Sequence, residues 1–561
     1  MIWTRRSLLG GGMAALGVFG GMPAACAQGG ARSTVTAGPD VEVEIADGRL
    51  RGGHSRGALA FKGIPYAGPV SGAARFREAP PVVPWSGVRD ARHLGAPSLQ
   101  KANSTYGEQE PAYAEDCLVL NVWTPAVNDG KKRPVMFYCH GGGFASGSAG
   151  STAQDGARLA ATYDVVVVAT NHRLGLLGYL YLGELGGPDW ATSGNQGMLD
   201  IVAGLRWVKA NIATFGGDPD NVTIFGESGG GFKVGTLLAM PSAKGLFHKA
   251  SIESGAALRR MPKEMATETA RRVLKGLGVA PNELHKLADI PAEQILAIQL
   301  AGEQGRGAMT MPSDGSAPLP RDGRLHMAGY PLPGGYGPVV DGVVLPADPF
   351  DPVASPLMAD VPLIVGHNRD EATFFNMGRP DTFTLDEAGL KARLAVEFGG
   401  DADRLLTVYR ATYPRATPSD LYIAIASARW FGAESATAAD RKSVQPAPVY
   451  RYRYDYESNF PVPGTAATLK AGHATEIAAL FLNTDQPGLE GDGPGLAEAS
   501  QRMSAFWASF ARDGKPTAPG QPDWPRYTTA DRPVMLINAV CHVENDPEGA
   551  ARQVWQEEVA D

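Results

Sequence analysis

The chain has 561 residues, of which 44% are hydrophobic and 20% are charged, a balance typical of globular proteins. Its 51 basic and 59 acidic residues give a formal net charge of −8 at pH 7, and neither sign forms a block. Because no basic stripe is present, we expect no nucleic-acid partner. The 70 glycines and 43 prolines predict many loops around a large α/β scaffold.

The first 27 residues are predicted to be a signal peptide. A twin-arginine pair at residues 5–6 precedes an apolar, Gly- and Ala-rich run without acidic residues, and residues 25–27 offer a small-x-small cleavage site. Cleavage after Ala27 would release the folded protein into a bacterial periplasm or beyond it. The glycines of the run make it a poor membrane-spanning helix. Lipidation of Cys26 is the alternative, which Pro23 disfavours because an aliphatic residue is expected there.

Residues 28–34 read as a short flexible tail and 35–561 as a single domain, because no repeat or convincing linker divides them. Residues 61–66 and 75–88 are rich in proline and are predicted to form an irregular loop over the core. Runs of β-branched and aromatic residues between turn formers predict strands. These strands are expected at 41–45, 117–123, 134–140, 164–170, 222–225, 250–254, 361–365, 449–456 and 533–538.

Strands and helices alternate in the first half of the chain. Apolar residues recur at helical spacing from 195 to 212, and four consecutive valines at 165–168 predict a strand buried on both faces. This alternation predicts a mostly parallel, doubly wound sheet with helices on both faces. Residues 256–335 break the alternation and are predicted to be a cap-like insertion over the edge of the sheet where α/β proteins bind ligands. Residues 384–443 are expected to be helical.

Residues 226–230 read Gly-Glu-Ser-Gly-Gly, a Gly-x-Ser-x-Gly pattern between the strand at 222–225 and an expected helix ending at Pro241. A one-residue corner would force Ser228 into strained backbone dihedrals, and flanking glycines would avoid a collision there. Ser228 would then stand at the positive end of the helix. A simple Gly-rich turn is the alternative interpretation. The flanking strand and helix favour the nucleophile elbow of a serine hydrolase.

Residues 140–144 read His-Gly-Gly-Gly-Phe directly after a predicted strand. Glycines allow the backbone amides to turn toward a substrate without obstruction by side chains. The stretch is not a phosphate-binding loop, because no Gly-Lys-Ser or Gly-Lys-Thr follows it. The N–H groups of Gly142, Gly143 and Gly229 are therefore the expected oxyanion hole.

In these motifs the chain resembles the type B carboxylesterases, the cholinesterase-like branch of the α/β-hydrolases that includes bacterial p-nitrobenzyl esterases. The resemblance spans Val41 to Asn538 and implies the α/β-hydrolase fold with long insertions over the active-site edge. It also implies hydrolysis of carboxylic esters without a cofactor, and no Cys/His spacing indicates a metal site. The matching motifs lie at 61–66, 115–123, 140–144, 171–175, 194–197, 215–219, 226–230, 245–248 and 253–255.

The acid of this family lies in a Gly-x-Asn-x-Asp-Glu stretch after a strand. Residues 366–371 match this stretch and imply that Glu371 is the acid, with Asp370 as its rival. The family's histidine precedes x-x-Glu at the start of a helix, which matches 472–476 and implies His473. The order Ser, Glu, His along the chain is the order expected of the fold.

In the implied mechanism, His473 takes the proton of Ser228 as the serine oxygen attacks a small-molecule ester, and Glu371 orients the imidazole. The alcohol leaves an acyl-enzyme that water then hydrolyses. Two alternatives use the same scaffold: a non-catalytic binding protein, which the complete triad disfavours, and an amidase, thioesterase or acyltransferase. The sequence leaves the natural substrate and the oligomeric state open. The pocket walls are expected near 99–114, 300–337 and 374–385.

The chain departs from the family pattern at several positions. Ser98 stands where many relatives have a cysteine that pairs with the equivalent of Cys117, so that disulfide is expected to be absent. His172 replaces a usual tyrosine. Gly229 replaces a usual alanine, which would keep the oxyanion N–H but loosen the elbow. Two further residues expected near the triad by resemblance, in either structural or catalytic roles, are Glu227 and Ser254.

Overall fold

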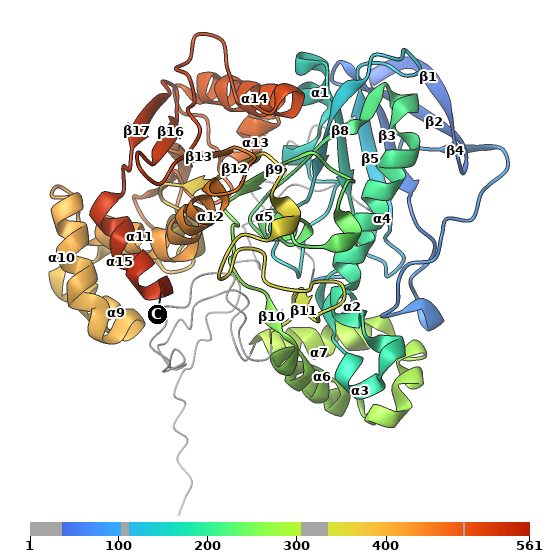
Figure 1. Cartoon of the computed structure of the whole chain (residues 1–561), viewed down its shortest axis with the longest axis horizontal. Helices are drawn as coiled ribbons and strands as arrows, with labels where there is room; N and C mark the ends of the chain where they lie inside the picture. Colours follow the sequence, from blue (N-terminus) through green and yellow to red (C-terminus); the bar gives the residue numbers. More distant parts are fainter. Residues whose placement is uncertain (1–35, 102–110, 305–334, 486–487, 561) are drawn as a thin grey trace, which may run out of the picture.

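The computed structural model describes residues 36–101, 111–304, 335–485 and 488–560. A 13-stranded sheet runs through it in the order β1-β2-β3-β5-β7-β6-β8-β9-β12-β13-β16-β17, with β4 beside β2 (Figure 1). The predicted signal peptide lies outside the described residues. The strands are β1 (Thr36–Ile45), β2 (Gly48–Ser55), β3 (Ala58–Pro65), β4 (Val88–Asp90), β5 (Val119–Thr124), β6 (Arg133–Tyr138), β7 (Val166–Thr170), β8 (Gly217–Glu227), β9 (Lys249–Glu253), β12 (Leu363–Asn368), β13 (Val449–Tyr454), β16 (Pro533–Ile537) and β17 (His542–Asn545).

The centre of the sheet is parallel, and its edges are antiparallel apart from the short strand β4, which pairs in parallel with β2. Every neighbouring pair from β7 to β16 is parallel. The pairs β1–β2, β2–β3, β3–β5 and β5–β7 at one edge and β16–β17 at the other are antiparallel. The predicted mostly parallel sheet with helices on both faces is therefore confirmed. Parallel strands end at the same edge, so the loops that follow β6, β8, β9 and β12 meet there.

The prediction of an irregular loop at 61–66 was wrong. Residues 61–65 belong to β3, which pairs antiparallel with both β2 and β5. The β3–β5 register is irregular between Phe61 and Ile64, and Gly63 has a positive φ of 66° there. Glycine and proline in this stretch thus mark a bulge and a strand end. Phe61 and Ile64 are fully buried, so the strand is part of the core.

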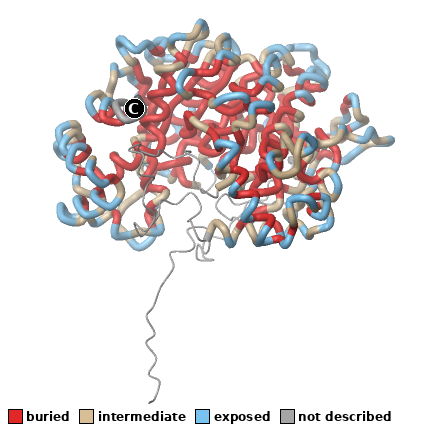
Figure 2. The backbone as a smooth tube through the Cα atoms, turned by 60° about the horizontal axis from the view of Figure 1, so that its bottom comes forward, coloured by how far each residue is buried: buried red, intermediate tan, exposed pale blue. Residues whose placement is uncertain are grey.

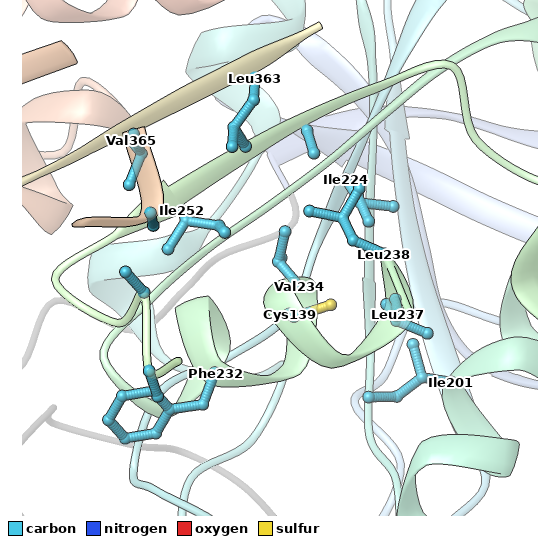
Figure 3. Packing of buried hydrophobic residues seen from close by; sticks show 14 of the residues in the cluster. Cys139, Ile201, Ile224, Phe232, Val234, Leu237, Leu238, Ile252, Leu363 and Val365 are labelled. Carbon is cyan, nitrogen blue, oxygen red and sulfur yellow. The ribbon is translucent and has the colours of Figure 1, made fainter. Parts of the chain in front are cut away.

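Two hydrophobic cores lie on opposite faces of the sheet, because successive side chains of a strand point to opposite sides. Val222 and Ile224 of β8 enter the core under α4 and α5, whereas Phe225 enters the core under α1 and α14. Figure 3 shows Val234 of α5 close to Ile224, and Leu237 of the same helix close to Ile201 of α4. Buried residues fill the interior of the molecule, and exposed residues lie at its periphery (Figure 2). The covering helices are α1 (Ala157–Tyr163), α4 (Gln196–Asn211), α5 (Gly229–Leu237) and α14 (Leu496–Asp513).

The remaining helices form two groups outside the sheet. The insertion predicted at 256–335 contains α6 and α7, which lie beside α2 and α3 at one end of the molecule (Figure 1), and its residues 305–334 lie outside the described part. The region predicted to be helical at 384–443 forms α9 to α12. These helices, with the short ones near the site, are α2 (Gly175–Tyr179), α3 (Gly183–Gly186), α6 (Lys263–Leu277), α7 (Ala292–Gln304), α8 (Ala372–Phe375), α9 (Glu387–Phe398), α10 (Ala402–Thr412), α11 (Pro418–Ser427), α12 (Ala433–Ser443), α13 (Ile477–Leu480) and α15 (Gly549–Ala560).

Two small two-stranded sheets complete the fold. One pairs β10 (Met261–Pro262) with β11 (Val339–Val340), and the other pairs β14 (Ser458–Pro461) with β15 (Thr468–Lys470). Among the residues that the structure describes, no helix has the length and apolar character needed to cross a membrane.

A buried ion pair fixes α4 to the loop that follows β7. Nε and Nη2 of Arg173 donate to the two carboxylate oxygens of Asp200 at 2.8 and 2.7 Å, and the side chains are 1% and 0% exposed. The backbone N–H of Arg173 also donates to Asp200 Oδ2 at 3.0 Å. The loop after β7 is thereby held beside the edge of the sheet where the predicted site lies.

We expect Asp200→Ala to lower the free energy of unfolding by about 3–5 kcal/mol, because it leaves the Arg173 guanidinium buried without a counter-charge. Denaturant unfolding would measure the loss. The control is Asp220→Ala, which removes a surface partner of Lys209 where the side chains are 70% and 44% exposed. That loss should stay below about 1 kcal/mol. Equal losses in the two variants would contradict the assigned importance of the buried pair.

Candidate active site

Ser228 occupies the corner between β8 and α5, with φ 56° and ψ −122°. This conformation is strained for a residue with a side chain and is found at functional sites. A Cβ atom on Gly226 would lie 2.5 Å from the carbonyl oxygen of Cys139, and one on Gly230 would collide with the same oxygen. Both flanking glycines are therefore required by the end of β6. The Ser228 N–H donates to the Glu253 carbonyl at 2.8 Å, which ties the corner to β9.

Glu371 and His473 are brought together from loops 102 residues apart in the sequence. Nδ1 of His473 lies 2.5 Å from Oε2 of Glu371, and both side chains are buried. The other carboxylate oxygen, Oε1, accepts hydrogen bonds from Ser254 Oγ at 2.6 Å and from the Asn368 N–H at 2.8 Å. Two donors and an imidazole thus converge on the carboxylate of Glu371.

Asp370, the rival acid, points elsewhere. Its Oδ2 accepts from the Arg369 guanidinium at 2.8 and 3.1 Å and from the Ala471 N–H at 3.2 Å. The Asp370 carboxylate therefore fastens its loop to the segment before His473, while the carboxylate of Glu371 faces the imidazole.

The imidazole of His473 lies among three aromatic rings. The ring centroids of Phe375 and Phe431 are each 4.8 Å from the imidazole centroid, and that of Phe374 is 5.8 Å away. The other ring nitrogen, Nε2, lies 3.2 Å from Oε1 of Glu227, the residue before Ser228. Within the described residues, no hydrogen bond joins Ser228 to His473. The structure therefore brings the acid to the histidine, and the histidine to the residue next to the serine.

Three further buried carboxyl groups surround this centre. Burial raises the pKa of Glu227 well above its usual value, with added repulsion from Glu371 and Glu253. Burial likewise raises the pKa of Glu476 well above its usual value, with repulsion from Glu227 and Glu371. It raises the pKa of Glu253 to about 7, against the lowering effect of hydrogen bonds from Ser251 and Trp507. Burial therefore favours the neutral forms of Glu227 and Glu476, which lowers the negative charge around Glu371.

The glycine loop after β6 lies directly over Ser228. A Cβ atom on Gly141 would lie 3.7 Å from Cβ of Ser228. Gly142 and Gly143 have positive φ angles of 83° and 61°. A Cβ atom on Gly229 would collide with the backbone N–H of Gly143. Glycine at 229 thus permits a close approach of the loop to the start of α5.

The other departures from the family pattern also have structural counterparts. Cys117, Cys139 and Cys541 are free and buried. Ser98 Oγ accepts from the Leu174 N–H at 3.2 Å. The ring of His172 stacks on that of His140 with centroids 4.7 Å apart and planes 8° apart. In the described part of the chain, no group of His, Cys, Asp and Glu side chains has a geometry that would hold a metal ion.

Residues 39–555 match the sequence profile of the carboxylesterase family. The chain belongs to the carboxylesterase family. The para-nitrobenzyl esterase of Bacillus subtilis is 34% identical over 514 residues, which cover 90% of this chain and 96% of that protein. The pig (Sus scrofa) liver carboxylesterase is 34% identical over 525 residues, which cover 86% and 87% of the two chains.

Solved structures that resemble this chain also include carboxylesterases. The carboxylesterase EST55 of Geobacillus stearothermophilus, at 38% identity, superposes with a TM-score of 0.77 and covers 92% of this chain and 100% of its own. The predicted resemblance to type B carboxylesterases and the predicted α/β-hydrolase fold are therefore confirmed. The protein is a carboxylic ester hydrolase.

Some residues of the site were missed from the sequence. Phe431 comes from a π-helical turn (Ala428–Gly432) between α11 and α12, and no motif marks it. Lys233 follows the elbow in α5 but has no place in the Gly-x-Ser-x-Gly pattern. Phe374 and Phe375 lie within the predicted wall segment 374–385, whereas most of the other two predicted wall segments lies outside the described residues.

We expect Glu253→Gln to flatten the pH dependence of stability. The folded-state pKa of Glu253 is about 7, above its usual value of 4.5. Folding therefore favours the protonated acid, and the wild-type protein loses stability as pH rises from about 4.5 to about 7. Glutamine keeps the acceptor oxygen for Ser251 and Trp507 without this loss. The variant should gain up to about 3 kcal/mol relative to wild type across that range.

Urea unfolding at pH 5 and pH 8 would measure this difference. The control is Glu498→Gln, which changes an exposed side chain of α14 and should leave the pH dependence as in wild type. A Glu253→Gln curve parallel to the wild-type curve would refute the raised pKa.

Proposed function

We propose that this carboxylesterase works through an acyl-enzyme on Ser228, with His473 as general base and Glu371 as the carboxylate that orients it. The observation that carries the proposal is the 2.5 Å contact between His473 Nδ1 and Glu371 Oε2 beside the strained corner at Ser228. With Nδ1 facing the carboxylate, the Nε2 atom of His473 is left as the proton acceptor.

In the first half of the reaction, Ser228 Oγ turns toward His473 Nε2, loses its proton to it and attacks the ester carbonyl. Such catalytic hydrogen bonds are often poorly aligned in a free enzyme and tighten when substrate binds. The N–H groups of Gly142, Gly143 and Gly229 stabilise the oxyanion, and the loss of one such donor typically removes about 3 kcal/mol of transition-state stabilisation.

In the second half, the imidazolium of His473 gives its proton to the departing alcohol. Water then loses a proton to the same nitrogen and attacks the acyl group on Ser228. The imidazolium returns this proton to Ser228 Oγ as the bond to the acyl group breaks, which releases the carboxylic acid and restores the serine. Every proton in the cycle passes through one imidazole nitrogen, so neither a metal nor a cofactor takes part in these steps.

The substrate is proposed to be a small-molecule carboxylic ester. A relative at 34% identity is named para-nitrobenzyl esterase, so para-nitrobenzyl esters are the first substrates to assay. A panel that varies the leaving atom from oxygen to nitrogen and sulfur would separate an esterase from an amidase or thioesterase. We expect ester cleavage to be the fastest.

We expect Ser228→Ala and His473→Ala each to lower kcat for such an ester by at least about 10³-fold, since nucleophile and base act as a unit. A fluorophosphonate probe followed by mass spectrometry should label Ser228 in the wild-type protein and nothing in Ser228→Ala. Ser443→Ala, in α12, is the control and should keep full activity. Turnover that survives in Ser228→Ala would overturn the mechanism.

We also propose that residues 1–27 export the folded protein through a twin-arginine pathway. The support is the arginine pair at residues 5–6 and the acid-free apolar run after it. Replacement of both arginines by lysine should move esterase activity from the periplasmic to the cytoplasmic fraction, and a chain starting at residue 28 is the cytoplasmic reference. An unchanged distribution in the lysine variant would contradict the proposal.

A further inference from the structure

Lys233 is a fully buried lysine on α5, five residues after Ser228. Its Nζ donates to the carbonyl oxygen of His140 at 2.7 Å and lies 6.0 Å from the ring centroid of Phe144. Among the described residues, no carboxylate forms an ion pair with it. Burial lowers the pKa of Lys233 to about 7. A buried amine without a counter-charge destabilises a fold. Its presence therefore indicates that its hydrogen bond has a local role.

The carbonyl that Lys233 holds belongs to the first residue of the glycine loop. The ring of His140 contacts the next peptide unit of the loop, because its Nδ1 lies 2.9 Å from the carbonyl oxygen of Gly141. Burial lowers the pKa of His140 well below its usual value, with further lowering by Lys233 and His172. The imidazole is therefore neutral at pH 7, and Nδ1 must carry the proton because a carbonyl accepts there.

The peptide unit that accepts this proton is the one between Gly141 and Gly142. Its other end is the N–H of Gly142, a donor of the proposed oxyanion hole. The next carbonyl, that of Gly142, accepts from the N–H groups of Ala145 and Ser146 at 3.2 and 3.1 Å. Three successive carbonyl groups, those of His140, Gly141 and Gly142, thus accept hydrogen bonds, and Lys233 links the first of them to α5.

We propose that Lys233 is a positioning residue for the oxyanion hole. Its hydrogen bond fixes the backbone of His140, and the His140 ring in turn fixes the peptide unit that presents the Gly142 N–H. This inference rests on the proposed function, because it assigns the Gly142 N–H to the oxyanion. Lys233 itself touches neither the substrate nor the reacting atoms.

This arrangement predicts a kinetic signature that a general packing role does not. The oxyanion exists in the transition state and not in the bound ester, so a misplaced donor lowers kcat and leaves KM nearly unchanged. Both an ammonium and a neutral amine donate from Nζ, so the effect should be similar at pH 6 and pH 8.5.

The test measures kcat and KM of Lys233→Met and His140→Phe and compares them with those of Lys442→Met. The concentration of active sites in each preparation is determined by titration with an organophosphate. Lys442 is a matched control, since it is also fully buried and its Nζ donates to the carbonyls of Met358 and Ala359 at 2.8 and 3.1 Å, away from the site. Lys233→Met should lower kcat about 10–100-fold with KM within about threefold of wild type. The control should keep both constants.

Two further measurements connect the effect to the oxyanion. The inhibition constant of a trifluoromethyl ketone, whose serine adduct carries an oxyanion, should rise by the same factor as kcat falls. The double variant Lys233→Met/His140→Phe should lose no more than the worse single variant, because both act on one peptide unit. If Lys233→Met is not recovered folded, His140→Phe must show the same signature by itself.

The inference is overturned if Lys233→Met and His140→Phe keep wild-type kcat, raise KM alone, or lose activity no differently from Lys442→Met. In those cases an inactive Ser228→Ala would still leave the proposed function standing. An active Ser228→Ala would instead remove the proposed function, whatever the lysine variants show.

Discussion

The contact between His473 and Glu371 depends on how the parallel strands end. β8, β9 and β12 are neighbours in the sheet, and their carboxyl ends supply Ser228, Ser254 and Glu371 in turn. His473 lies in a different part of the chain, the loop after β15. The side chain of Asn368 joins the two loops, because it donates to the carbonyl of Gly472 at 2.8 Å and to Glu476. The contact between the imidazole and its carboxylate thus depends on the end of β12 and on the loop that carries His473.

Burial controls the charges around this contact. Glu227, Glu253 and Glu476 have raised pKa values, and Lys233 and His140 have lowered ones. In each case desolvation is the largest cause, since the low dielectric disfavours the charged form. Hydrogen-bonding groups of Ser254, Asn368 and His473 converge on the carboxylate of Glu371. The site therefore concentrates one supported carboxylate among groups that burial pushes toward neutrality.

Close backbone packing, as much as charge, shapes the proposed oxyanion hole. The end of β6, the glycine loop and the start of α5 approach until side chains at Gly226, Gly229 and Gly230 would collide with the loop or with Cys139. The same approach brings Lys233 to the His140 carbonyl. The sheet-facing side of α5, seen in Figure 3, packs into the core, so the helix cannot move away from the loop without exposing Val234 and Leu237.

The sequence by itself determined the features that depend on neighbours along the chain. The alternation of strands and helices gave the parallel sheet, and the valines at 165–168 gave a fully buried strand. Glycines around Ser228 marked the corner, because only a residue without a side chain fits so close to Cys139. It failed at 61–66, where glycine and proline mark a bulge and an end of β3 and not a loop.

Only the tertiary structure decided what depends on distance in space. It identified Glu371, and not Asp370, as the carboxylate that faces His473. The two acids are adjacent in one motif, so the sequence alone does not distinguish them. It brought Phe431 to the imidazole and Lys233 to the glycine loop, although neither stands in a motif. It also showed which carboxyl groups are buried together, and the pKa of a group follows from that shared burial.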